Sequence, residues 1–91
     1  MAQVVITLKI MPESPDTSLE KIEKNAREII NKEGEFVKKE IKPVAFGLNE
    51  LDMVFLLDEK KASIVDKLEE RIKNIKGVAN AEIVDVRRTL G

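Results

Sequence analysis

The chain has 91 residues, of which 43% are hydrophobic and 36% are charged, with a net charge of −1 and neither His nor Cys. This composition indicates one globular domain spanning residues 1–91 and excludes intrinsic disorder, disulfide bonds and thiol chemistry. No apolar run approaches the roughly 20 residues of a membrane span, and no secretory signal is recognisable, so we expect a cytoplasmic protein that does not bind membranes. Because the net charge is close to zero, we also expect no direct binding of nucleic acid.

The first expected element is a strand over residues 3–11, where hydrophobic and other side chains alternate with a period of two. Two prolines then interrupt the pattern. Thr17 and Glu20 have the spacing of a capping box, which predicts a helix that begins here and ends at Gly34. This helix is expected to bury the apolar residues that recur at helical spacing, Leu19, Ile22, Ala26, Ile29 and Ile30.

A second, more charged strand is predicted over residues 35–43. Val37 and Ile41 fall on one of its faces, and charged residues fall on the other. So many charges favour a strand at the edge of the sheet.

The connection after this strand is unusually apolar. Turns are normally made of Gly, Asn, Asp, Ser and Pro, and Pro43 and Gly47 fit this chemistry. Val44, Phe46 and Leu48 are instead large and hydrophobic. An aromatic residue held outward by neighbouring Gly and Pro is typical of a small interface anchor. The alternative is that Phe46 folds back and closes the end of the sheet, and the sequence by itself favours neither.

A third strand is predicted over residues 51–57, whose apolar positions alternate. The intervening Val54 and Leu56 make both of its faces hydrophobic, which is expected for a strand near the centre of the sheet. Residues 58–61 are then predicted to form a turn.

A second helix is predicted after this turn, with Ser63 and Asp66 as its capping pair and Gly77 as its C-terminal stop. Its buried stripe is expected to comprise Ile64, Val65, Leu68, Ile72 and Ile75. A last strand is predicted over residues 78–87.

The predicted order is strand, helix, strand, strand, helix, strand, in two similar halves. This order is that of an α+β, ferredoxin-like βαββαβ sandwich, in which a four-stranded antiparallel sheet carries two helices on one face. The fold itself does not decide the function, because it hosts enzymes, metal chaperones, RNA binders and ligand sensors.

Catalytic and cofactor chemistry is poorly represented in the sequence. Without His or Cys the chain lacks the commonest general base, the thiol nucleophile and the usual ligands of soft metals. The acidic connection over residues 11–16 disfavours phosphate binding, and three Phe residues are too few for an RNA-stacking sheet. We therefore expect no catalytic residue, no metal site and no cofactor. Two functions stay open: a protein that works by contact, or a small-ligand-binding regulatory module.

Several segments in succession resemble one known family. "VVITLKIMPESPD", "PVAFGLNEL", "DEKK", "VDKLEE" and the terminal "VDVRRTLG" are similar to archaeal translation elongation factor 1-beta along the whole chain. The resemblance implies a guanine-nucleotide exchange factor for elongation factor 1-alpha, the GTPase that delivers aminoacyl-tRNA. Exchange involves no covalent chemistry, so the absence of catalytic residues agrees with this function, and we expect the protein to be monomeric when alone.

The resemblance also assigns a partner-binding loop. The aromatic residue that the family inserts into a pocket of its GTPase falls on Phe46, with Pro43, Ala45 and Gly47 around it. These residues are therefore expected to bind elongation factor 1-alpha.

The C-terminus departs from the family pattern. Eukaryotic members carry a near-terminal Lys that disturbs the Mg²⁺ site of the GTPase, and Gly91 stands at the matching position here. Arg87 and Arg88 are candidates to supply the missing cation, and the alternative is that they are solvated charges at a strand end.

Overall fold

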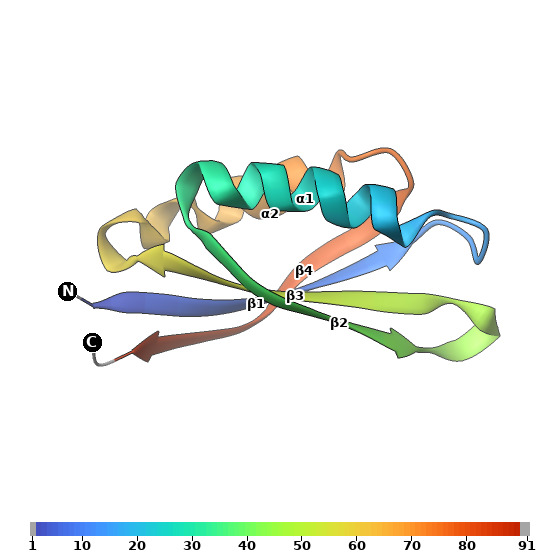
Figure 1. The fold of residues 1–91 in the computed structure, drawn as a ribbon, viewed down its shortest axis with the longest axis horizontal. Coiled ribbons are helices and arrows are strands. Elements are labelled where there is room, and N and C mark those ends of the chain that lie inside the picture. The colour runs from blue at the N-terminus through green and yellow to red at the C-terminus, as the bar shows by residue number, and fades with distance from the viewer. Residues whose placement is uncertain (1, 90–91) are drawn as a thin grey trace.

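Two layers, a sheet and a pair of helices, make up the molecule in a computed structural model that describes residues 2–89 (Figure 1). The elements in chain order are β1 (Gln3–Pro12), α1 (Leu19–Glu33), β2 (Glu35–Pro43), a 3₁₀ turn η1 (Ala45–Gly47), β3 (Asn49–Asp58), a 3₁₀ helix η2 (Glu59–Ile64), α2 (Val65–Lys73) and β4 (Val78–Thr89). This is the predicted ferredoxin-like α+β arrangement.

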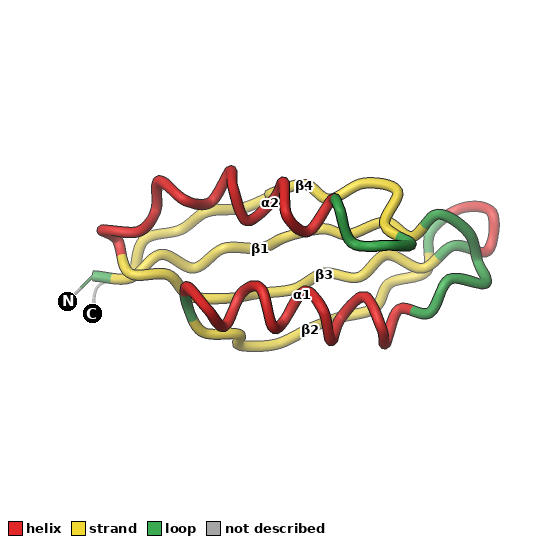
Figure 2. The backbone as a smooth tube through the Cα atoms, turned by 90° about the horizontal axis from the view of Figure 1, so that it is seen from above, coloured by secondary structure: helices red, strands yellow, loops and turns green. Residues whose placement is uncertain are grey.

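The four strands form one sheet in the order β2-β3-β1-β4, and every neighbouring pair is antiparallel. Both helices cover the same face, α1 on the side of β2 and β3 and α2 on the side of β4 (Figure 2). The other face of the sheet has no helix over it (Figure 1). The hydrophobic third strand is central, as predicted from its two apolar faces.

The core lies between the central strands and the helices. β1 and β3 place their large side chains opposite one another, with Ile6 across from Phe55 and Leu8 across from Met53. The helix residues that the spacing selected contribute the other side: Ile22, Ala26, Ile30, Leu68 and Ile72 are buried, and Leu19, Ile29, Ile64, Val65 and Ile75 pack partly against them. The predicted packing of both helices on one sheet face is thus confirmed.

β2 is an edge strand, as its charges predicted, but its apolar face is not buried. The pairing with β3 shifts between Phe36 and Lys38, which leaves Val37 as the extra residue of a β-bulge. Val37 and Ile41 are both about half exposed. The alternation alone could not show this, because a bulge changes which residues face the core and α1 does not extend over the outer strand.

The first helix begins one residue later than the capping box predicted. The hydroxyl of Ser18 accepts a hydrogen bond from the backbone N–H of Lys21 at 3.4 Å, so Ser18 is the N-cap. Thr17 instead serves the preceding turn, where its hydroxyl accepts from the N–H of Ser14 at 3.2 Å. The prediction that Thr17 and Glu20 form the cap was therefore wrong.

The second helix also differs from its prediction at both ends. Residues 58–61 do not form a simple turn, because the Asp58 carboxylate accepts from the N–H of Lys60 at 2.9 Å and starts η2. η2 then takes up Ser63, so Ser63 and Asp66 do not cap α2. α2 ends at Lys73, before the predicted stop at Gly77.

Gly77 lies in the turn that enters β4 and has a φ of 96°. Its carbonyl accepts a hydrogen bond from the N–H of Glu13 at 2.9 Å, which ties this turn to the β1–α1 connection. β4 starts where predicted and runs two residues further, and its pairing with β1 shifts twice, at Ala79 and at a bulge at Val84.

Gly34 is the predicted end of α1, and its position shows why no larger residue fits. Its N–H donates to the carbonyl of Ile30 at 2.8 Å and closes the helix. A Cβ atom at Gly34 would lie 2.1 Å from the carbonyl oxygen of Leu56 in β3. The chain can cross from α1 to the edge strand only because this position has no side chain.

We expect Gly34→Ala to lower the free energy of unfolding by about 1–3 kcal/mol, because the backbone of β3 must move to admit the new methyl group. Lys32→Ala, in the same last turn of α1 but exposed, is the matched control and is expected to stay within about 0.5 kcal/mol of the parent. Urea unfolding of the three proteins measures both effects. Equal midpoints for Gly34→Ala and the parent would contradict the close approach.

Candidate functional site

The apolar connection forms a tight turn at the tip of the β2–β3 hairpin. The N–H of Leu48 donates to the carbonyl of Ala45 at 3.4 Å, and the N–H of Val44 donates to the carbonyl of Leu48 at 2.8 Å. The two central residues, Phe46 and Gly47, have φ values of 64° and 75°. Positive φ at both central positions is the geometry of a type I′ turn, which normally takes Asn and Gly.

Phe46 points into solvent with 93% of its surface exposed. Val44 and Leu48, in contrast, are half-buried and close the base of the turn. Phe46 therefore does not fold back over the end of the sheet. Among residues 2–89 it is also the one residue other than glycine with positive φ. A strained backbone that presents a large exposed aromatic favours a binding role over a structural one.

Charged residues close to this turn form a network on the face of the sheet that carries no helix. Lys42 Nζ lies 3.3 Å from Oδ2 of Asp52, and Lys9 Nζ lies 3.7 Å from Oε1 of Glu50. Asp52 is buried, and within residues 2–89 its Oδ1 has no hydrogen-bond donor. The hydrogen bond to Asp52, burial and the charge of Asp52 together raise the pKa of Glu50. The hydrogen bond to Asp52 also raises the pKa of Lys42.

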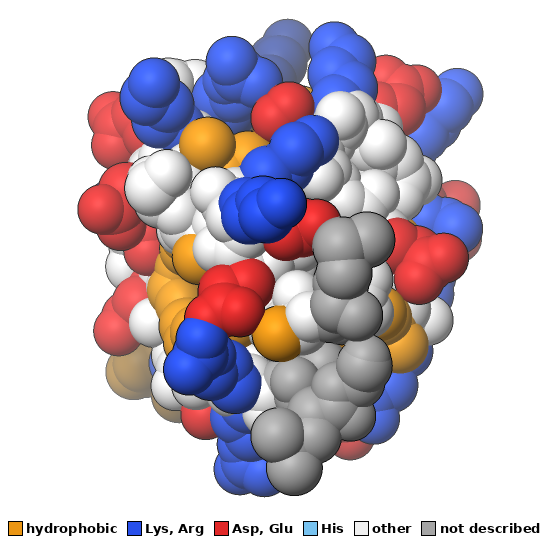
Figure 3. All heavy atoms as spheres, turned by 90° about the vertical axis from the view of Figure 1, so that its left-hand side faces the viewer, with side chains coloured by type: hydrophobic (Ala, Val, Ile, Leu, Met, Phe, Trp, Pro, Cys, Tyr) orange, Lys and Arg blue, Asp and Glu red, His pale blue; other side chains and the backbone are white. Residues whose placement is uncertain are grey.

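The two candidate arginines lie near the end of β4, and each is paired with a carboxylate. Arg87 Nε lies 2.9 Å from Oδ2 of Asp85, and Arg88 is ion-paired with Glu59 at the start of η2. Both arginine side chains are exposed by more than two thirds. Figure 3 looks onto this end of the molecule, where basic and acidic side chains alternate around a few apolar ones. Gly91, the position of the eukaryotic Lys, lies outside the described residues.

The structure does not bring the two candidate groups together. The hairpin tip lies at one end of the sheet and the last residues of β4 lie at the other (Figure 1). The molecule is 41 Å long and only 20 by 17 Å across. A partner that contacts both groups must therefore extend along most of the long axis.

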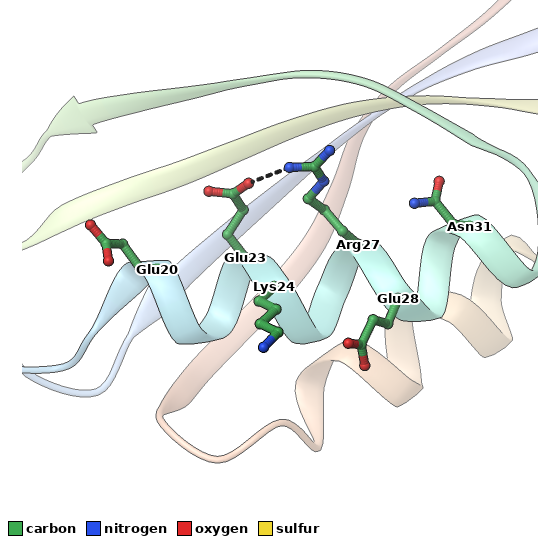
Figure 4. A pocket seen from close by; sticks show the side chains of 6 residues that line it. All are labelled: Glu20, Glu23, Lys24, Arg27, Glu28 and Asn31. Carbon is green, nitrogen blue, oxygen red and sulfur yellow. Dashed lines mark hydrogen bonds and ion pairs between the residues drawn. The ribbon is translucent and has the colours of Figure 1, made fainter.

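A hollow of about 320 Å³ on α1 belongs to neither end (Figure 4). It is lined by Glu20, Glu23, Lys24, Arg27, Glu28 and Asn31. Glu23 is ion-paired with Arg27 at 3.2 Å and with Lys39 of β2, and Arg27 stacks over the ring of Phe36 at 4.4 Å. The hydrogen bond from Lys39 is the main cause of the lowered pKa of Glu23, and that from Arg27 adds to it.

These contacts fasten the edge strand to α1, so we assign the hollow a structural role. In the sequence, Glu23 and Arg27 have the spacing of an ordinary ion pair one helical turn apart on a solvated helix face. The contact with Lys39 was not foreseen, because it depends on the bulge at Val37 that turns Lys39 toward the helix.

Two further features of the described residues concern metals and membranes. Residues 2–89 contain no group of three or more acidic side chains arranged to hold a metal ion. No helix in the same part of the chain is both long and apolar enough to span a bilayer.

Comparison with known proteins gives a consistent result at the level of sequence. Residues 5–89 match the family model described as the EF-1 guanine nucleotide exchange domain. Elongation factor 1-beta of Methanobrevibacter smithii is 40% identical over 90 residues, which cover 99% of this chain and 100% of that protein. Elongation factor 1-beta of Saccharolobus solfataricus is 35% identical over 88 residues, or 97% of both chains.

Solved structures with little sequence identity share only the fold. The ACT domain of GTP pyrophosphokinase from Chlorobium tepidum is 12% identical, with a TM-score of 0.63 over 90% of this chain and 99% of that one. The designed protein Foldit4 is 20% identical, with a TM-score of 0.66 over 98% of both chains. These likenesses carry no argument about a ligand.

The neighbouring carboxyl groups of Glu50 and Asp52, close to the turn between β2 and β3, lead to a prediction about how the stability depends on pH. Because the pKa of Glu50 is raised in the folded protein, its contribution to stability is present below its unfolded pKa and is lost as the pH rises through its folded pKa. Asp52→Asn removes the main cause, so we expect its free energy of unfolding relative to the parent to be roughly 0.5 kcal/mol more favourable at neutral pH than in acid, on top of a pH-independent loss of the ion pair with Lys42.

Urea unfolding of both proteins between about pH 4 and pH 8 measures this difference. The pH dependence of Glu23, which has the opposite sign, is common to both proteins and cancels. Asp66→Asn, an exposed carboxylate of α2, controls for the loss of one negative charge. A difference between the two proteins that is equal at all pH values would show that Asp52 does not raise the pKa of Glu50.

Proposed function

Because the chain belongs to the EF-1 guanine nucleotide exchange domain family and acts as a guanine-nucleotide exchange factor in translation elongation, we propose that it binds its GTPase through the two ends of its sheet. The GTPase is elongation factor 1-alpha, the partner that this family implies. The observation that carries the proposal is Phe46, which is held outward in a left-handed turn with 93% of its surface exposed.

Exchange of this kind requires binding and no covalent chemistry. A factor that prefers the nucleotide-free GTPase must, by thermodynamic reciprocity, weaken the binding of nucleotide and Mg²⁺ to that GTPase while it is bound. GTP from solution then refills the site when the factor leaves. The protein therefore needs no catalytic side chain, metal or cofactor of its own.

The hairpin tip is the anchor in this proposal. Phe46 enters an apolar pocket on elongation factor 1-alpha, while Pro43, Ala45 and Gly47 shape the turn that presents it. The family places an aromatic at this position, and its exposure leaves it free to be buried by a partner. Burial of one Phe contributes about 1.5–3 kcal/mol.

The arginines at the other end of the sheet act through their positive charge. Arg87 and Arg88 are long, exposed cations beside the chain terminus, and they can approach the acidic surroundings of the Mg²⁺ ion in the GTPase without being buried in their own fold. The length of 41 Å lets the anchor and these cations contact separate parts of the partner.

The remaining features of the proposal concern the state of the protein. We infer that residues 1–91 act as a single exchange domain, monomeric when alone and located in the cytoplasm, without direct contacts to nucleic acid. The near-neutral composition and the match over residues 5–89 support this. The small-ligand module has no comparable support, because the hollow on α1 is lined mainly by charged side chains, and two of these, Glu23 and Arg27, are paired with each other.

Release of a fluorescent GDP from elongation factor 1-alpha tests the role of the anchor. An interface aromatic typically costs about 2 kcal/mol when truncated, so Phe46→Ala is expected to weaken binding of the GTPase by on the order of 30-fold. Its thermal stability should stay close to that of the parent, because the ring touches little in the free protein.

Phe46→Gly is the companion variant, because glycine adopts a positive φ without strain. It is expected to lose the same affinity and to be no less stable than Phe46→Ala. A large loss of stability in both variants, with normal affinity among the folded molecules, would assign Phe46 to the core and remove the anchor.

The arginines are tested in the same assay. We expect Arg87→Ala with Arg88→Ala to slow GDP release several-fold, because their surface pairs contribute only about 0–1 kcal/mol to folding while their charge acts on the partner. The melting temperature reports on folding, and Lys24→Ala with Lys32→Ala removes two exposed positive charges of α1 as a control. Unchanged release kinetics would show that both arginines are ordinary solvated charges.

A further inference from the structure

Three segments that are distant in sequence meet beside the end of β4. Gln3 of β1 lies opposite Asp58 of β3 on one side and opposite Thr89 of β4 on the other. The N–H of Glu59 donates to the carbonyl of Ala2 at 3.2 Å. The first residue of η2 is therefore fixed next to the last residues of β4.

The bulge at Val84 decides which arginine reaches η2. Before it, Ile83 lies opposite Leu8, and after it Asp85 lies opposite Thr7, so the alternation of β4 shifts by one residue. As a result Arg88 lies opposite Val4, whose side chain is in the core on the helix side, and Arg87 lies opposite Val5 on the open face. The two arginines thus project from opposite faces of the sheet.

Arg88 consequently has an internal counter-ion from another element of the fold. It is ion-paired with Glu59, whereas the carboxylate that pairs with Arg87 among the described residues is Asp85, two residues away on its own strand. The Arg88 side chain keeps 70% of its surface exposed and that of Glu59 keeps 38%. A pair this exposed is weak enough to be exchanged for another carboxylate.

We propose that Glu59 is a positioning residue that restrains Arg88, and that the exchange factor must break this pair when it binds the acidic nucleotide site of its GTPase. The inference rests on the role proposed above for the C-terminal arginines and goes beyond it by naming which arginine is held and by what. The restraint lowers affinity for the partner. A lower affinity allows the factor to leave, and an exchange factor that cannot leave turns over only once.

The test is Glu59→Gln in the full chain, measured by GDP release at increasing concentrations of elongation factor 1-alpha. Loss of a competing surface ion pair should lower KM for the GTPase by about threefold. The maximal exchange rate is expected not to rise, because Arg88, the cation that acts on the nucleotide site once the complex has formed, is unchanged in this variant. The gain should disappear at high salt, where exposed charges are screened.

Two companion variants separate the specific contact from general charge. Glu70→Gln removes an exposed carboxylate of α2 and is expected to leave KM unchanged. Glu59→Gln combined with Arg88→Ala should show the same KM as Arg88→Ala alone, since the restraint has nothing left to act on. Melting temperatures check that each variant is folded.

The possible results distinguish this inference from the function on which it rests. If Arg88→Ala weakens exchange and Glu59→Gln leaves KM unchanged or raises it, the restraint is wrong and the role of the arginine stands. An equal gain in Glu70→Gln, or a gain that persists without Arg88, would also overturn the restraint. If Arg88→Ala has no effect on exchange, the proposed role of the arginine fails, and the restraint fails with it.

Discussion

The burial of alternate side chains on β1 and β3 is the constraint on which the rest of the structure depends. Ile6, Leu8, Met53 and Phe55 have no exposed surface, and they face one another beneath the helices. A slip of one residue between these strands would turn the whole apolar set toward water, so the register has a single favourable value. That register fixes where the β2–β3 hairpin turns and where β4 ends.

Both candidate binding groups are consequences of this register, and they are separated by it. Long antiparallel strands joined by tight connections produce a narrow body of 41 Å, with Phe46 at one tip and Arg87 and Arg88 at the other. Each tip offers the proposed partner one kind of contact, an aromatic ring at one end and charged side chains at the other. Two contacts on one rigid body, however, add their effects without a second loss of translational freedom, which suits a factor that must bind and then leave.

The sequence predicted those features that depend on periodicity. The order of elements, the central position of β3 and the buried stripes of both helices follow from patterns repeated over many residues. The predictions failed where a single side chain could form its hydrogen bond with either of two nearby backbone groups. Thr17 bonds within the preceding turn and leaves the cap to Ser18, and no spacing rule distinguishes these outcomes.

Bulges caused the other differences, because a single extra residue inverts every assignment that follows it. Val37 is an extra residue that the alternation could not reveal, and the bulge at Val84 decides that Arg88, and not Arg87, lies on the helix side of the sheet. The sequence left open whether Phe46 is exposed, because the same residues suit a ring that closes the end of the sheet and a ring that binds a partner. Only the backbone geometry of the turn distinguishes them.

The two tips also differ in the way they are prepared for binding. In the proposed complex the turn keeps its backbone conformation, so the strain at Phe46 adds nothing to affinity directly. Its effect is to hold the ring outward, which reduces the conformational entropy lost on binding. Arg88 has the opposite character, because its long side chain must leave Glu59 and become ordered on the partner. In the proposed complex the rigid aromatic therefore supplies affinity that is present from the first contact. The cation supplies an effect that develops only once the anchor has brought it close to the nucleotide site.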